Sequence, residues 1–254
     1  MVDSAGARPL ATSEPEKDPS LPDEGREMTL MEHMIELRDR LIKAVLALAI
    51  GTIIGFVVAE QAFRLLISPL PEAAKVVALS PTDTIISYFK VSLVIGTIIG
   101  MPVILYELLQ FVLPGLYPNE QRYLYYIVPA ATVAFAGGAV FAALVVVPFS
   151  IRYLSGFLAY LVSPTYQIQS YIGFVSSLMF WIGIVFEMPL VIFFLAKLKI
   201  INYQKLSSSR KYAIVLIAVL AAVITPTPDP FTMMIVMVPL VILYEIGVQL
   251  ARVA

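Results

Sequence analysis

The chain has 254 residues, of which 59% are hydrophobic and only 14% are charged, with a net charge of −1. Soluble domains are nearer half apolar and a quarter charged, so this composition indicates a polytopic membrane protein. The lack of cysteine excludes disulfides and thiol chemistry. The single histidine, His33, cannot form a metal site alone. We therefore expect no metal, no cofactor and no nucleic acid as a partner.

The chain begins with a polar segment that differs from everything after it. Residues 1–27 are rich in Pro, Glu, Asp and Ser and have few large apolar side chains, which predicts a disordered cytoplasmic tail. They lack the apolar core of a signal peptide. From Met28 onward, apolar residues recur at helical spacing between charges and predict an amphipathic helix that runs into the first membrane span. Residues 28–254 are expected to form one all-α membrane domain.

Six apolar stretches predict six transmembrane helices. Their approximate ranges are 41–59, 84–113, 123–149, 168–196, 212–225 and 231–250. A helix needs about 20 residues to cross the hydrocarbon core, and the fifth stretch is shorter. Either the bilayer is thin at this place, or the TPTPDP turn before the last span lies within the membrane boundary. A re-entrant hairpin made by the last two stretches is the alternative.

Lysine and arginine are distributed unequally between the two sides of the membrane. With six spans, thirteen of the 17 lie on the side that holds both chain ends, and four lie on the other: Arg64, Lys75, Lys90 and Arg152. Cytoplasmic segments carry the excess of positive charge, so both termini are expected in the cytoplasm.

The turn between the second and third spans holds a rigidly placed acid. Residues 111–122 read FVLPGLYPNEQR, and their prolines, glycine and asparagine force a turn around Glu120. Glu36 in the amphipathic helix is expected at the same membrane surface. Two carboxylates at such a boundary suit guanidinium groups, which bind carboxylates in a bidentate fork. The alternative is that Glu36 pairs with Arg40 four residues along its helix, and the spacing alone leaves both open.

Two further acids are candidates for function. Glu187 lies about ten residues before Lys197, which places it roughly 15 Å below the cytoplasmic surface. An acid at that depth is costly and is a functional hypothesis by default, so we expect it to be neutral or paired. The alternative is a protonated acid that only joins two helices. Asp229 lies between prolines before the last span, where it could simply cap that helix.

Four strings in register resemble one known family. EHMIELRDRL, PVILYELLQFVLPGLYPNEQR, FEMPLVIFFL and TPTPDPFTMMIVMVPLVILYEIG follow one another in the order and spacing of TatC, the receptor subunit of the twin-arginine protein translocase. The resemblance runs from about Met28 to the C-terminus. It implies a cup-shaped bundle of six helices in the bacterial cytoplasmic (inner) membrane, with both termini in the cytoplasm.

The resemblance also assigns roles to residues. It implies that Glu36 and Glu120 bind the twin arginines of signal peptides and that Glu187 docks small single-span subunits of the TatA/TatB type. The other matching positions are Phe111, Pro114 and Leu116, which shape the binding site; Arg38 in the amphipathic helix; and Asp229, the outer-side acid. Gln121 departs from the pattern by separating the acid from Arg122. Glu107 stands where glutamine is often expected, and its contribution is open.

The function expected from the resemblance is recognition of folded precursor proteins through their Arg-Arg signal peptides. Transport would follow by assembly with partner subunits and further copies of the chain, driven by the proton-motive force. We find no nucleophile–base pair and therefore do not expect an enzyme. The alternative is a proton-coupled secondary transporter that uses Glu187, although the two halves show no inverted repeat. A purely structural scaffold is a third possibility.

Overall fold

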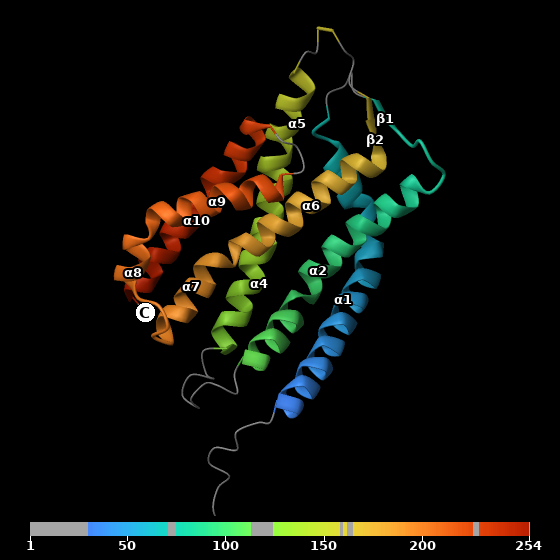
Figure 1. Cartoon of the computed structure of the whole chain (residues 1–254). Helices are drawn as coiled ribbons and strands as arrows, with labels where there is room; N and C mark the ends of the chain where they lie inside the picture. Colours follow the sequence, from blue (N-terminus) through green and yellow to red (C-terminus); the bar gives the residue numbers. More distant parts are fainter. Residues whose placement is uncertain are drawn as a thin grey trace, which may run out of the picture.

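In the part of the chain that the structure describes, the fold is helical with one short pair of strands (Figure 1). The computed structural model describes residues 30–70, 75–112, 124–157, 160–161, 165–225 and 229–253. Its elements are α1 (Leu30–Ile67), β1 (Lys75–Val77), α2 (Asp83–Val112), α4 (Leu124–Phe141), η2 (Ala142–Val146), α5 (Val147–Gly156), β2 (Thr165–Gln167), α6 (Ile168–Phe186), α7 (Met188–Lys197), α8 (Tyr203–Ser208), α9 (Arg210–Ile224) and α10 (Pro230–Val253).

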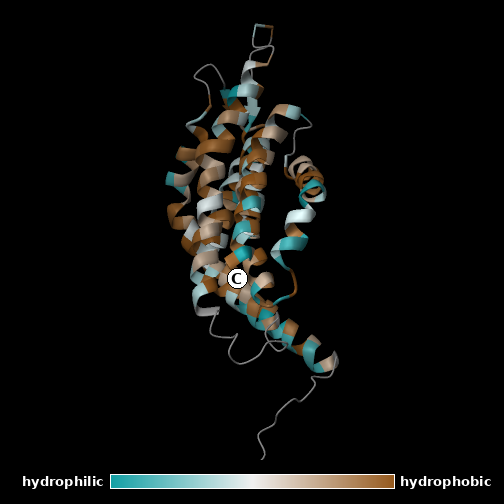
Figure 2. Cartoon of the chain, turned by 90° about the vertical axis from the view of Figure 1, so that its left-hand side faces the viewer, coloured by the Kyte–Doolittle hydropathy of each residue, from teal (hydrophilic) through white to brown (hydrophobic). Residues whose placement is uncertain are grey.

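Helix α1 joins the amphipathic segment and the first span without a break, as predicted. It continues to Ile67, so the sequence-based end near Ala59 was wrong. The last turns are kept helical by good helix formers and by an ion pair between Glu60 and Arg64, four residues apart. Many apolar side chains of the helices are exposed, because a bilayer and not water is their solvent. Figure 2 shows that hydrophobic residues predominate along the middle of the helices.

Two prolines shape the third and fourth spans. Pro148 has no N–H and crowds the preceding turn, and the helix passes through the wider π-helical turn η2 just before it. The third span then extends to Gly156, beyond the predicted end at Phe149. Pro189 interrupts the fourth span, which is divided into α6 and α7 at Glu187. This local opening of the helix was expected from the position of the proline.

The pairing of β1 with β2 was not predicted. The two strands run parallel, with Lys75 opposite Thr165 and Val77 opposite Gln167. Asp83, the first residue of α2, fixes this end of the molecule. Its Oδ2 accepts hydrogen bonds from the backbone N–H of Leu79 at 2.9 Å and from Gln167 Nε2 at 3.0 Å. The carboxylate therefore starts α2 and connects it to β2.

Small residues let α1 and α2 pack closely along their length (Figure 1). Both helices contain the sequence GTIIG, at 51–55 and at 96–100, and the two segments face each other. A Cβ added at Gly96 would lie 2.5 Å from the backbone nitrogen of Thr52, which no real side chain tolerates. Close approach of backbones through small residues is the usual way in which membrane helices associate. This contact sets the relative position of α1 and α2.

Within the described residues, five helical segments are long and apolar enough to cross a membrane. Helix α9 is not among them because its 15 residues extend only about 22 Å at 1.5 Å per residue. The short fifth stretch is thus confirmed as a short helix. The start of α1 and the C-terminus lie toward the same end in Figure 1, as an even number of crossings requires. The six-span topology stays a prediction.

Helix α9 is too short to cross a full bilayer, so we expect the membrane to be thin at this place. The start of α10 should then be accessible from the outer side. Phe231 is 45% exposed, whereas the neighbouring Thr232 is fully buried. Phe231→Cys should react with a membrane-impermeant maleimide added from outside, and Thr232→Cys should stay protected. The parent chain has no cysteine, so the background is zero. Protection of both positions would contradict a thin membrane here.

Candidate functional site

The first turns of α1 and the last turns of α2 meet in a cage of polar side chains around Arg40. Its Nε and Nη2 donate to Glu36 Oε1 at 2.8 and 2.5 Å. Its Nη1 donates to Gln110 Oε1 at 2.5 Å and to Glu107 Oε2 at 3.3 Å. The guanidinium therefore connects one acid of its own helix to two acceptors of the neighbouring helix, and only about a fifth of the arginine side chain is exposed.

Further contacts hold this cage together. Lys43 Nζ lies 3.7 Å from Glu107 Oε1, so that carboxylate is close to two cations. The rings of His33 and Phe111 stack with their centroids 4.3 Å apart, which joins the start of α1 to the end of α2. Gln110 also donates to the hydroxyl of Tyr106. The predicted site residue Phe111 thus contacts the same helix that carries Glu36.

A charged groove of about 580 Å³ opens beside the cage. Its lining is Glu32, Ile35, Glu36, Asp39, Arg40, Lys43 and Gln110. Three of these residues are acids, and the two cations, Arg40 and Lys43, follow them along α1. Glu36 Oε2 is buried and has no hydrogen-bond partner among the described residues, since Arg40 uses only the other oxygen; His33 Nδ1 lies 3.8 Å from it. This oxygen therefore has unused hydrogen-bonding capacity just beneath the surface of the groove.

The structure describes only part of the predicted receptor site. Glu36 and Phe111 come together at one end of the α1–α2 pair. Arg38 instead pairs with the neighbouring Asp39 at 2.8 Å, with about two thirds of its side chain exposed. Glu120, Pro114 and Leu116 lie outside the described residues.

Arg40, Glu107 and Gln110 were not assigned to the site from the sequence. Arg40 was considered only as a partner for Glu36 four residues away. That ion pair is present, with Arg40 Nη2 2.5 Å from Glu36 Oε1. Glu107 and Gln110 are three residues apart near the end of a helix, which places both side chains on one face. This spacing was the one signal in the sequence that the two residues could act together.

Glu187 lies at the junction of α6 and α7, and 8% of its surface is exposed. Its Oε1 is buried with no hydrogen-bond partner among the described residues. Pro189 two residues later has no N–H to donate, so the regular hydrogen bond to the residue four positions earlier is missing; the backbone N–H of Glu187 donates instead to the carbonyls of Ile184 and Val185. The result is a polar break in an otherwise apolar helical wall, at the place where the sequence predicted a polar notch.

Asp229 caps the last helix. Its Oδ1 accepts a hydrogen bond from the backbone N–H of Thr232 at 2.7 Å, which is the contact of an N-cap residue. The capping role considered from the sequence is confirmed. No group of three metal-ligating side chains occurs in the part of the chain that the structure describes.

The comparisons with known proteins agree on one family. Residues 32–239 match the family model described as Sec-independent protein translocase protein (TatC). The chain belongs to the TatC family. It is 39% identical to the TatC protein of Aquifex aeolicus, over 89% of this chain and 96% of that protein. It is 35% identical to that of Carboxydothermus hydrogenoformans, over 90% and 95% respectively.

A solved structure supports the same assignment. The crystal structure described as the twin arginine translocase receptor TatC in DDM is 38% identical, with a TM-score of 0.78, and the match covers 87% of this chain and all of that one. The predicted all-α polytopic fold is confirmed by this match. Family membership makes the chain a multi-pass membrane component of the Sec-independent translocase that works with other Tat subunits. TatC proteins are translocase components, not a family of catalytic enzymes.

Proposed function

We propose that the chain is the receptor subunit that binds Arg-Arg signal peptides of folded precursors and gathers the partner subunits for export driven by the proton-motive force. The observation that carries this proposal is the cage around Arg40. Glu36, Glu107 and Gln110 present oxygens on three sides of a guanidinium, at distances of 2.5 to 3.3 Å. A groove that already holds one arginine side chain is suited to receive others.

The charge of the groove favours arginine over other ligands. An incoming guanidinium would reach the buried Glu36 Oε2 by displacing side chains that cover it, while the other carboxylate oxygen stays fixed by Arg40. Fixing one oxygen orients the carboxylate plane, so less side-chain entropy is lost when a ligand binds. Asp39 and Glu32 also line the groove and raise its negative potential. Because arginine presents a planar fork of donors, it can bind such a surface through two hydrogen bonds, whereas lysine offers a point charge.

Glu120 is included in the proposed site on the basis of the sequence alone. It follows the last described residue of α2, Val112, by eight positions in the turn that resembles the family pattern. We assign it to the second arginine of the signal peptide, with Pro114 and Leu116 shaping the turn. The site then belongs at the cytoplasmic face of the bacterial inner membrane, where newly folded precursors are found.

Photo-crosslinking tests the location of the site. A photoreactive amino acid at Ile35, which lines the groove and is 46% exposed, should crosslink to an Arg-Arg signal peptide. The same probe at Val133, which is 71% exposed on α4, should give no crosslink. Adding an unlabelled Arg-Arg peptide should abolish the crosslink at position 35 by competing for the site. Equal yields at the two positions would contradict a binding site in this groove.

We assign docking of small single-span TatA/TatB-type subunits to the break at Glu187. A helix from another chain that carries one polar residue at matching depth could satisfy the buried Oε1. Hydrogen bonds between membrane helices contribute about 0.6–2 kcal/mol, which suits a reversible contact. Further copies of the chain would complete the assembly around the lipid-facing surfaces.

Glu187→Ala should leave binding of the Arg-Arg peptide intact and weaken crosslinks between the α6–α7 region and the partner helix by several-fold. Glu187→Gln keeps a polar group at the notch and should restore most of the crosslinking. Peptide affinity and crosslink yield are measured on the same preparations. Loss of peptide binding with unchanged partner crosslinks would place Glu187 in the receptor site or in the core instead.

A further inference from the structure

Lys90 lies inside a membrane-crossing helix without a partner among the described residues. It is the eighth residue of α2, about 10 Å along the helix from Asp83. Its Nζ lies against α6, where a Cβ added at Gly173 would be only 3.2 Å from it. The acid on the same helix, Asp83, already accepts hydrogen bonds from Gln167 and from backbone N–H groups. This half-buried cation can therefore accept an anion from outside the described residues.

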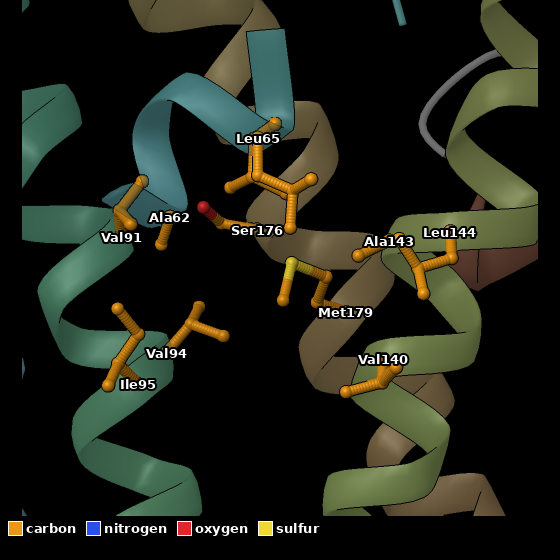
Figure 3. A pocket seen from close by; sticks show the side chains of 11 residues that line it. Ala62, Leu65, Val91, Val94, Ile95, Val140, Ala143, Leu144, Ser176 and Met179 are labelled. Atoms are coloured by element: carbon orange, nitrogen blue, oxygen red, sulfur yellow. The ribbon is translucent and has the colours of Figure 1, made fainter. Parts of the chain in front are cut away.

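An apolar crevice, shown in Figure 3, is lined on α2 by residues that follow Lys90 in the chain, from Val91 to Ile95. Its volume is about 130 Å³, and it lies between the α1–α2 pair on one side and α4, η2 and α6 on the other. The lining residues are Ala62, Leu65, Leu66, Val91, Val94, Ile95, Val140, Ala143, Leu144, Ser176 and Met179. Leu65, Val140 and Leu144 are each more than half exposed, so the mouth of the crevice faces the bilayer.

One polar group in the crevice has no partner. Ser176 is 8% exposed, and its Oγ is buried with no hydrogen-bond partner among the described residues. Its hydroxyl points toward the side of the crevice formed by α1 and α2, as Figure 3 shows. Ser176 lies one helical turn from Gly173, against which the ammonium of Lys90 rests. A free cation, a free hydroxyl and an apolar crevice therefore follow one another from the β1–β2 end toward the bilayer centre.

We propose that this arrangement binds an anionic phospholipid. The phosphate would accept hydrogen bonds from Lys90 Nζ, a glycerol ester oxygen would accept one from Ser176 Oγ, and one acyl chain would enter the crevice. The order matches the lipid itself, whose charged, ester and hydrocarbon parts follow in that sequence along its length. Under the predicted topology the lipid belongs to the outer leaflet.

A lipid fits these residues better than an acidic partner helix does. The crevice is lined by residues of five helical segments, which leaves room for a hydrocarbon chain but not for a helix about 10 Å wide. The bilayer also supplies acyl chains at this depth without any further protein. A lysine near a helix end reaches upward along its stem, so its ammonium can meet the headgroup while its methylenes stay in apolar surroundings.

Native mass spectrometry of the purified full chain tests the proposal. Delipidated protein is mixed with phosphatidylglycerol or with phosphatidylcholine of the same acyl chains, and bound lipid is counted. We expect about a tenfold preference for phosphatidylglycerol, because the choline cation of the other lipid neutralises the phosphate that Lys90 would bind. Lys90→Gln removes the protein cation that senses this difference and should abolish the preference. Lys75→Gln, in exposed β1 at the same end, is the matched control and should keep the preference.

A second pair of variants separates the crevice from the headgroup site. Ala143→Phe fills the crevice and should weaken the binding of both lipids. Val133→Phe, on the exposed face of α4, should leave the binding of both unchanged. Circular dichroism checks that each variant is folded. Equal binding of both lipids, unchanged binding by Lys90→Gln, or displacement of the lipid by inorganic phosphate would overturn the proposal. Crosslinking of a photoreactive residue at position 90 to a partner protein in native membranes would also overturn it.

Discussion

Glu36→Gln should lower the affinity for an Arg-Arg signal peptide by roughly ten- to a hundredfold, because a charge-assisted hydrogen bond is worth about 1.5–3 kcal/mol. The change removes the charge that meets the incoming guanidinium and also weakens the contact with Arg40. Glu120→Gln should have an effect of the same size if it holds the second arginine. Fluorescence anisotropy with a labelled peptide and purified protein in detergent measures both.

A matched control for this prediction is present on the same helix. Glu60 pairs with Arg64 four residues away at 2.8 Å, as Glu36 pairs with Arg40, but it lies at the opposite end of α1. Glu60→Gln should therefore leave peptide affinity unchanged. If Glu60→Gln and Glu36→Gln weaken binding equally, the effect is a general loss of helix stability or of net charge, and the receptor assignment fails.

Gly96→Val should separate α1 from α2 and lower both the thermal stability and the peptide affinity of the chain. The added side chain would collide with the backbone of Thr52, which cannot move without shifting α1. Overpacking of this kind costs about 1–3 kcal/mol. Since Arg40 on α1 reaches Glu107 and Gln110 on α2, a shift of the two helices also opens the cage. A fluorescence-detected melt and the anisotropy assay report the two effects.

Gly137→Val is the control for Gly96→Val. No atom lies within 4 Å of a Cβ added at Gly137, which is on the exposed side of α4. This variant should melt within a degree or two of the parent and bind the peptide normally, as surface changes away from special features usually do. A Gly96→Val protein with parental stability and affinity would show that the close α1–α2 contact does not position the site.

The helices were largely predictable because hydropathy and proline positions are local properties of the sequence. The second span was expected from 84 to 113 and runs from Asp83 to Val112. The break at Glu187 followed from Pro189, and the short α9 from the length of its apolar stretch. Helix ends beyond the apolar core were missed, since α1 continues through charged residues that pair along its own surface.

Contacts between distant segments were not predictable from pattern alone. The parallel pairing of 75–77 with 165–167 joins two short segments about 90 residues apart, and neither has a distinctive alternation. The facing GTIIG segments were present in the sequence, but glycine spacing does not reveal its partner. In the site, Glu36 was found from its position and family pattern. The role of Glu107 and Gln110 depends on α2 lying beside α1, which only the structure shows.

The groove beside Glu36 should select arginine pairs, and a titration with two matched peptides tests this selectivity most directly. Purified wild-type chain is titrated with two signal peptides that differ only in having Arg-Arg or Lys-Lys. We predict that the Arg-Arg peptide binds at least about tenfold more tightly, because only guanidinium offers the planar fork that carboxylates bind through two hydrogen bonds. Equal affinity for the two peptides would contradict the account.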